Sequence, residues 1–308
     1  MAELKEVNLA LGGGGAKGFV HLGVLEELTN RKIEIKSIVA TSIGAIIGAL
    51  FAYYAAELYK DRKNPQQLAA KAVSSTFLTT SFWKLSDVNF LSLLTQGIFR
   101  GKKISAWLSE HLTRRDDITP LRFGELDFPL TITATDAHTG RSHILNKENE
   151  PGMFIHEAVR ASMSIQYVFK AVWLEIGGTP TLCWDGGTTG NCRFDLPQKL
   201  YPGRRTLASS LTYRGQVVST ETGLIGAWMR PLKVLNHTTA ILMRAVEEGM
   251  RECMPEEAKK EIIFVDPLLS TGRSLVGTYN FHLNQEQREA LIKNGRIAVA
   301  KALDGSIK

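Results

Sequence analysis

The spacing of the apolar residues changes several times along this chain, and each change marks a short strand followed by a helix. Residues 7–11 and 37–39 are runs of the kind that form buried strands. Small residues follow each run, and apolar residues then recur at helical spacing, first over residues 19–28 and later from Ser42 onward. Strands that alternate with helices predict an α/β fold, in which helices cover both faces of a largely parallel sheet.

The second half of the chain continues this alternation. Further strands are predicted at residues 130–135, 142–145, 206–211 and 262–265, where β-forming residues lie between turn residues. The first of these ends at Asp136, and a turn at Gly140 lets the second pair beside it. Asn284 and Gln287 form a capping-box pattern that predicts the start of a final helix.

Residues 37–56 carry no charge and are long enough to cross a bilayer. The stretch nevertheless opens with β-branched residues and turns at residues 41–44 before it becomes helical. This order favours a buried strand and a buried helix over a membrane span. Gly44 and Gly48 lie four residues apart, which predicts that the helix packs closely on the sheet or on a neighbouring helix.

The composition is that of a folded domain. The 308 residues are 44% hydrophobic and 22% charged, and no segment resembles a linker. We therefore predict a single domain over residues 1–308, with core elements at about residues 5–215 and a C-terminal strand and helices at about 216–305. The net charge of +6 favours anionic partners such as a membrane surface or nucleic acid.

The N-terminal residues and the cysteines indicate the cellular compartment. Residues 1–6 do not resemble a secretory signal, and three cysteines are too few for a disulfide framework, so we expect a cytoplasmic protein. No histidine pair lies at zinc-site spacing beside the cysteines, so no metal is expected.

Two small-residue segments carry the candidate chemistry. In the first, residues 12–18, a glycine loop leaves a strand and can aim its backbone N–H groups at an anion, as an oxyanion hole does. In the second, Ser42 lies between small residues at a strand-to-helix turn, which is the layout of a nucleophile elbow. Together the two segments indicate acyl-transfer chemistry.

The first loop also fits the dinucleotide fingerprint, so an NAD(P)-dependent Rossmann oxidoreductase is the main alternative. That fingerprint expects an acidic residue at the end of the second strand. Here Glu34 lies at the beginning of that strand, and Thr41 and Ser42 follow its end. A P-loop is excluded because no Gly-Lys-Ser/Thr follows the glycines.

Ser42 also has a structural interpretation, because serine is a favoured N-cap and a helix begins there. A third element favours catalysis. Asp185 ends a predicted strand and is followed by Gly186 and Gly187. An isolated Asp-Gly-Gly is usually a turn, but the three elements in this order are far more specific than any one of them.

These residues resemble the patatin-like phospholipase family, particularly its bacterial form. The matching segments are residues 13–25, 41–45, 158–165 and 185–187, with weaker matches at residues 134–140 and in the final helix. The resemblance implies a three-layer α/β fold and a Ser–Asp dyad that needs no histidine, cofactor or metal. It also implies an enzyme that cleaves lipid carboxylic esters, with glycerophospholipids as the first expectation and neutral or short-chain esters as the second.

Carried over to this chain, the resemblance makes Ser42 the nucleophile that accepts the acyl group. Asp185 is then the base that takes its proton and later activates water. Gly13, Gly14 and Gly15 would bind the oxyanion through their backbone amides.

Lys17 and Gly18 are carried over as substrate-binding or loop-supporting residues. Lys17 would steady the loop or attract a phosphate headgroup, and its alternative is a solvated surface lysine. The chain departs from the family at Ala40, where glycine is usual, at Gln166, where proline is common, and at residues 188–192. These departures affect the expected substrate more than the dyad.

A conventional Ser-His-Asp esterase is a further alternative, with Asp136 or Asp185 as the acid. Its candidate histidines are His143, His156, His237 and His282, none of which lies in a distinctive loop motif.

The aromatic-rich residues 76–99 predict either core helices or a lid that faces lipid beside Arg100, Lys102 and Lys103. The expected partners are therefore a lipid or ester substrate and, peripherally, an anionic membrane surface. No nucleic acid is expected, and the sequence leaves the oligomeric state open.

Overall fold

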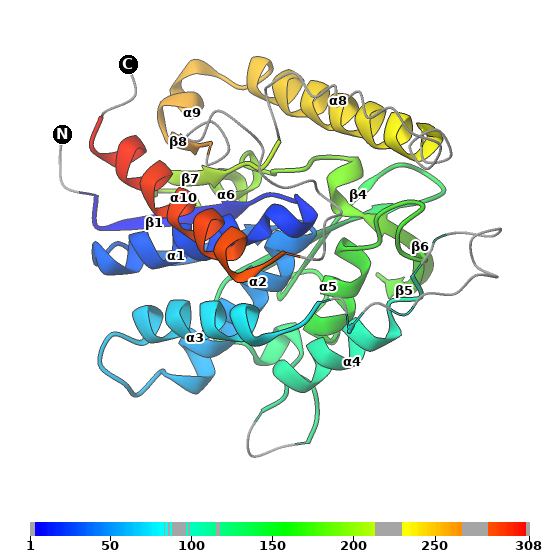
Figure 1. The fold of residues 1–308 in the computed structure, drawn as a ribbon, viewed down its shortest axis with the longest axis horizontal. Helices are drawn as coiled ribbons and strands as arrows, with labels where there is room; N and C mark the ends of the chain where they lie inside the picture. The colour runs from blue at the N-terminus through cyan, green and yellow to red at the C-terminus, as the bar shows by residue number, and fades with distance from the viewer. Residues whose placement is uncertain are drawn as a thin grey trace.

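One sheet runs through the centre of the molecule (Figure 1). The structure is a computed structural model that describes residues 4–82, 84–85, 87, 97, 99–114, 118–212, 230–266 and 283–305, with backbone alone at 230–240. In this part of the chain the strands are β1 (Glu6–Leu11), β2 (Glu34–Ala40), β3 (Leu130–Asp136), β4 (Ser142–Asn146), β5 (Val172–Ile176), β6 (Thr179–Asp185), β7 (Thr206–Ser209) and β8 (Ile262–Val265).

The sheet order is β5-β6-β3-β2-β1-β7-β8, and β4 also pairs with β3. The run from β3 to β8 is parallel, which confirms the predicted largely parallel sheet. The β4, β5 and β6 strands are antiparallel to their neighbours. The β5–β6 hairpin was not predicted, although Gly177 and Gly178 form its turn with φ of 56° and 76°. Two adjacent glycines are a recognised signal for such a turn.

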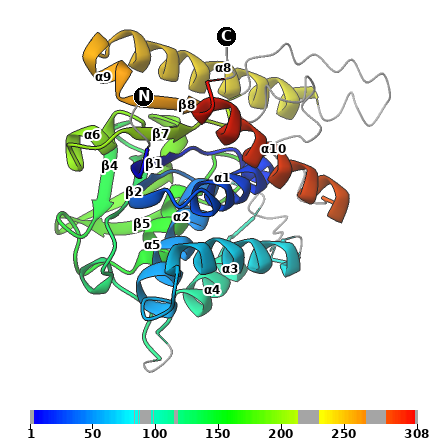
Figure 2. The ribbon, with the colours of Figure 1, turned by 90° about the vertical axis from the view of Figure 1, so that its left-hand side faces the viewer.

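Helices cover the sheet on both faces (Figures 1 and 2). They are α1 (Phe19–Asn30), α2 (Ile43–Tyr53), α3 (Pro65–Thr79), α4 (Lys102–His111), α5 (Ile155–Ser162), α6 (Leu196–Leu200), α8 (Arg230–Glu252), α9 (Glu256–Lys260) and α10 (Gln285–Leu303), with shorter turns η1 (Gly15–Gly18), η2 (Tyr54–Leu58), η4 (Phe123–Glu125) and η5 (Gly186–Thr188). Figure 2 shows α8 and α3 on opposite sides of the sheet.

The uncharged stretch at residues 37–56 forms the end of β2, then α2 and the start of η2, as the sequence predicts. A Cβ on Gly44 would lie 2.5 Å from the carbonyl oxygen of Leu11, and one on Gly48 would lie 2.9 Å from Ile38. Both glycines therefore allow α2 to lie close against the sheet. Within the described residues, no helix combines the length and the apolar character needed to cross a membrane.

The last helix packs along the first (Figure 1). A Cβ on Gly23 would lie 1.9 Å from the carbonyl oxygen of Ile292, and one on Gly295 would lie 2.1 Å from that of Val20. Glycine at both positions is what allows α1 and α10 to approach so closely. The predicted capping box that begins α10 is confirmed, because Asn284 and Gln287 exchange side chain to backbone hydrogen bonds of 2.8 and 3.1 Å.

The aromatic residues at 76–99 form core contacts where the structure describes them. Phe77 is buried at the end of α3, and its ring packs against those of Phe19 and Phe82 at centroid distances of 5.7 and 5.1 Å. Residues 83, 86, 88–96 and 98 of this stretch lie outside the described residues, so the lid interpretation stays a prediction.

Candidate active site

The register of the sheet brings the predicted nucleophile and base to the same level. Ala40 of β2 lies beside Ile132 of β3, and Ala134 of β3 lies beside Asp185 of β6. Ser42 follows Ala40 by two residues, as Ala134 follows Ile132. Continuing the register therefore places Ser42 level with Asp185 across the end of β3.

Ser42 occupies a strained turn between β2 and α2. Its backbone angles are φ 55° and ψ −123°, a region that side-chain-bearing residues rarely adopt. Although Ser42 precedes α2, its side chain forms no capping hydrogen bond, so the N-cap interpretation does not explain the residue. The backbone strain and the uncommitted hydroxyl are what a nucleophile elbow requires.

Asp185 ends β6 and is 2% exposed. Its Oδ1 accepts a hydrogen bond of 2.7 Å from the N–H of Gly187, whereas its buried Oδ2 has no hydrogen-bond partner among the described residues. Burial raises the pKa of Asp185 to about 7, opposed by smaller lowering effects of the nearby Ser42 side chain and of the Gly187 N–H. The Ser42 hydroxyl thus lies close enough to the carboxyl to favour its ionised form.

The C-terminal end of α5 holds both residues through one short segment. The hydroxyl of Ser162 accepts the N–H of Ser42 at 2.8 Å, and the carbonyl of Ser164 accepts the N–H of Asp185 at 2.9 Å. Both serines are fully buried, and Arg160 donates to the Ser164 hydroxyl at 2.7 Å. Residues 158–165 could be predicted only from the family resemblance, because these contacts join segments far apart in the chain.

The glycine loop lies directly against Ser42. A Cβ on Gly13 would lie 3.1 Å from Cβ of Ser42 and 2.5 Å from Oδ1 of Asn191. The N–H of Gly13 already donates to the carbonyl of Asn191 at 3.0 Å. Gly14 and Gly15 donate to no described residue, so their amides have no acceptor in the described part of the chain, and the oxyanion role of the loop stays a prediction.

Lys17 and Gly18 lie in η1, between the loop and α1. Lys17 is 9% exposed, so its interpretation as a solvated surface lysine is wrong, and burial lowers the pKa of its ammonium group. Lys17 forms no ion pair with any described residue. A Cβ on Gly18 would lie 2.1 Å from the side chain of Ile43, so Gly18 allows η1 to pack against the residue that follows Ser42.

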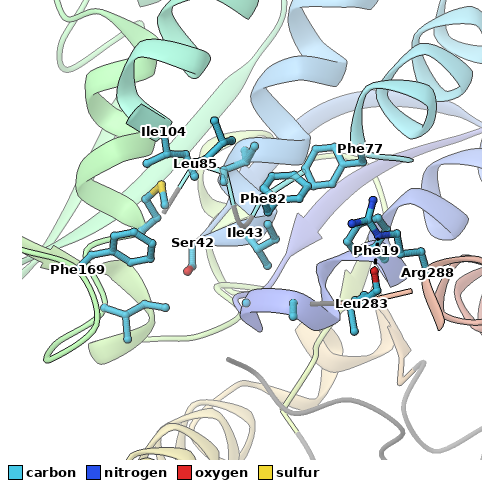
Figure 3. A pocket seen from close by; sticks show the side chains of 15 residues that line it. Phe19, Ser42, Ile43, Phe77, Phe82, Leu85, Ile104, Phe169, Leu283 and Arg288 are labelled. Atoms are coloured by element: carbon cyan, nitrogen blue, oxygen red, sulfur yellow. Dashed lines mark hydrogen bonds between the residues drawn. The ribbon is translucent and has the colours of Figure 1, made fainter. Parts of the chain in front are cut away.

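An apolar pocket opens beside Ser42 (Figure 3). It encloses about 780 Å³ of empty space, part of it open to solvent. Its walls are Gly15, Ala16, Phe19, Ser42, Ile43, Ile46, Phe77, Phe82, Leu85, Ile104, Met163, Ile165, Phe169, Leu283 and Arg288. Three of these, Phe77, Phe82 and Leu85, come from the aromatic-rich stretch. The walls therefore suit a hydrocarbon chain.

Arg288 is the charged residue of this lining, and it lies apart from Ser42 in Figure 3. Its Nε donates to the carbonyl of Leu283 at 3.1 Å, and its Nη1 donates to those of Leu78 and Thr80 at 3.0 and 3.3 Å. Its Nη2 donates to no described residue, and no described carboxylate pairs with it. The guanidinium group also lies 5.4 Å from the ring centroid of Phe19, and among the described residues its Nη2 keeps the capacity to donate to an anion.

The histidines proposed for a triad do not join the site where they are described. His143 and His156 form no hydrogen bond to Ser42 or Asp185, and each keeps one buried ring nitrogen without a partner among the described residues. The side chain of His237 and the whole of His282 lie outside the described residues, so that part of the alternative is untested.

A histidine that the sequence did not single out supports the glycine loop instead. His21 is fully buried, its Nε2 donates to the carbonyl of Gly12 at 2.8 Å, and its Nδ1 lies 3.0 Å from the hydroxyl of Ser209. A carbonyl only accepts, so Nε2 carries the proton and Nδ1 accepts from Ser209. Burial lowers the pKa of His21 to about 4, which keeps the ring neutral at pH 7.

No group of three potential metal ligands gathers anywhere in the described part of the chain. Cys183 and Cys192 are buried, as expected for small apolar residues, and Cys253 is exposed.

Comparison with known proteins identifies the class. Residues 9–197 match the model of the patatin-like phospholipase family, and the chain belongs to this family. The expected resemblance is therefore confirmed.

The chain is also similar to individual relatives and to a solved structure, and it spans less than two thirds of the length of the first curated relatives it matches. The chain is 28% identical to YqhO of Bacillus subtilis over 304 residues, which cover 92% of this chain and 93% of YqhO. It is 33% identical to the uncharacterized NTE family protein Rv1063c of Mycobacterium tuberculosis over 159 residues, which cover 52% of this chain but only 37% of that protein. The fold is similar to that of VipD from Legionella pneumophila, with a TM-score of 0.50 at 13% identity over 98% of this chain and 67% of VipD.

Proposed function

We propose that this protein is a serine acyl hydrolase that cleaves lipid carboxylic esters through Ser42 and Asp185. The observation that carries the proposal is the buried Oδ2 of Asp185, which has no hydrogen-bond partner among the described residues and lies level with the strained Ser42 beside an apolar pocket. A buried carboxylate oxygen requires a hydrogen-bond donor, and the serine hydroxyl next to it is able to donate.

The chemistry proceeds in two halves. Asp185 takes the proton of the Ser42 hydroxyl as its oxygen attacks the ester carbonyl, and the amides of Gly14 and Gly15 stabilise the oxyanion. The tetrahedral intermediate expels the alcohol, which receives the proton from Asp185. Asp185 then takes a proton from water, hydroxide attacks the acyl-enzyme, and the fatty acid leaves as Ser42 regains its proton.

A fluorophosphonate probe tests this proposal, because it reacts only with an activated serine. We expect one adduct, which peptide mass spectrometry places on Ser42, and we expect excess lipid ester to slow its formation. The competing Rossmann interpretation makes a different prediction. Binding of NAD or NADP at micromolar concentration, together with no adduct on Ser42, would falsify the hydrolase proposal.

We further propose that the ester substrate is a phospholipid, whose phosphate group pairs with Arg288. The support is a guanidinium group that is already fixed by three backbone carbonyls, lines the same pocket as Ser42, and has no partner for its Nη2 among the described residues. Lys17 remains a second candidate for the headgroup or for loop support, and the net charge of +6 supports peripheral contact with an anionic membrane surface.

Arg288→Gln should impair the enzyme only toward phosphate-bearing substrates. A charge-assisted hydrogen bond contributes about 1.5–3 kcal/mol, so we expect KM for lysophosphatidylglycerol to rise at least about tenfold. Hydrolysis of a monoacylglycerol with the same acyl chain should change less than about twofold. Steady-state kinetics on both substrates measures this selectivity.

Arg296→Gln is the matched control, because Arg296 lies on the same helix and its Nε donates to Glu26 at 2.7 Å, away from the pocket lining. Equal losses on both substrates in Arg288→Gln would show that Arg288 only fastens α10 to the end of α3.

A further inference from the structure

A chain of hydrogen bonds connects α8 to the glycine loop. Asn191 binds Gly13 at two points, because the N–H of Gly13 donates to the Asn191 carbonyl at 3.0 Å and Nδ2 of Asn191 donates to the Gly13 carbonyl at 3.1 Å. The same Nδ2 donates to the hydroxyl of Thr212 at 3.0 Å, and that hydroxyl donates to Glu247 at 2.9 Å. Asn191 and Glu247 are each 5% exposed.

The donor and the acceptor of each hydrogen bond in this series follow from the bond between Thr212 and Glu247. The Thr212 hydroxyl donates its single proton to a carboxylate oxygen of Glu247. The Thr212 oxygen must then accept from Asn191, which fixes the side-chain amide with Nδ2 toward Gly13. The hydroxyl of Ser210 donates to the other oxygen of Glu247 at 2.9 Å and so holds the carboxylate in place.

The same helix, α8, also contacts the residue that binds the base. A Cβ on Gly187 would lie 3.2 Å from the terminal methyl group of Met243, and the N–H of Gly187 is the donor that holds Asp185. Thr212, Met243 and Glu247 all lie beyond residues 9–197, which the family model matches. The C-terminal part of this chain therefore contacts, from outside the matched region, Asn191, which binds the loop, and Gly187, which binds the base.

We propose that Glu247, acting through Thr212 and Asn191, holds the glycine loop so that Gly14 and Gly15 point their amides at the oxyanion. These are positioning residues, since none of them touches the reacting atoms. The inference depends on the proposed hydrolase function, because it assigns an oxyanion to the loop. Its expected signature is a loss of kcat with little change in KM, because the oxyanion forms only in the transition state.

Thr212→Val and Thr212→Ser separate the hydroxyl from the shape of the residue. Removing an oxyanion donor outright costs about 10²–10³ in kcat, so misplacing two of them in Thr212→Val should cost about 10- to 100-fold. Thr212→Ser keeps the hydroxyl and should stay within about threefold of wild type. Fluorophosphonate titration counts the active sites in each preparation. Dividing the maximal rate of hydrolysis by that count gives kcat per active site and removes any effect of partial unfolding.

Glu247→Gln tests the carboxylate, with Glu248→Gln as its control. Glu248 is the next residue of α8, half exposed, and pairs with Arg244 at 2.8 Å. We expect Glu247→Gln to lower kcat per active site at least about fivefold and Glu248→Gln to leave it unchanged.

Two results would overturn the inference while the hydrolase proposal stands. In the first, Thr212→Val has the wild-type kcat per active site. In the second, Thr212→Ser loses as much kcat per active site as Thr212→Val does. A wild-type protein that forms no Ser42 adduct would overturn both proposals.

Discussion

Ser42→Ala should abolish ester hydrolysis while the protein remains folded. Alanine keeps the Cβ that contacts the glycine loop and removes only the hydroxyl, so the packing beside Gly13 is preserved. Loss of a serine nucleophile lowers kcat by roughly 10⁶-fold in enzymes whose catalytic residues act as a unit. We expect a loss of similar size here, measured as release of fatty acid from a phospholipid and from a monoacylglycerol.

Ser75→Ala serves as the control for this change, because Ser75 is an exposed serine of α3. Both variants should give the wild-type circular dichroism spectrum and melting temperature. Only Ser42→Ala should also lose the fluorophosphonate adduct. Substantial turnover by a folded Ser42→Ala preparation, with a second serine labelled, would place the nucleophile elsewhere.

The elements of the candidate site could be predicted because their signals are local. Each of three motifs consists of a few consecutive residues: the glycine loop after β1, the turn after β2 and the Asp-Gly-Gly after β6. Glycine is needed at Gly13, Gly44 and Gly186, because a Cβ at each position would lie 3.1 Å or less from a neighbouring atom. Short motifs of this kind depend little on the rest of the fold.

The residues that hold these motifs in place could not be predicted in the same way. Ser162 reaches Ser42 across 120 positions of the sequence, and Asn191 reaches Gly13 across 178. Nothing near either residue in the chain indicates its partner, because the register of the sheet and the packing of the helices bring them together. The same holds for Arg288, whose link to Leu78 spans 210 positions.

Burial of Asp185 has opposite consequences for activity and for stability. The carboxylate accepts the serine proton only when ionised, and its pKa is raised to about 7. We therefore expect kcat/KM of the wild type to rise about tenfold per pH unit below pH 7 and to level off above it. The stability that the protonated form provides is complete below the unfolded pKa of 3.8 and is lost as the pH rises through about 7.

Asp185→Asn should eliminate this pH dependence together with most of the activity. Asparagine keeps the shape of the side chain but cannot accept the proton of Ser42, so kcat should fall by about 10³- to 10⁴-fold. Because asparagine never ionises, the variant should gain stability over the wild type as the pH rises from about 5 to about 8, measured by urea denaturation at both pH values. Single replacements of His143 and His156 by glutamine serve as controls and should retain activity. If either control loses several orders of magnitude while Asp185→Asn remains active, the base is a histidine and the Ser42–Asp185 dyad is wrong.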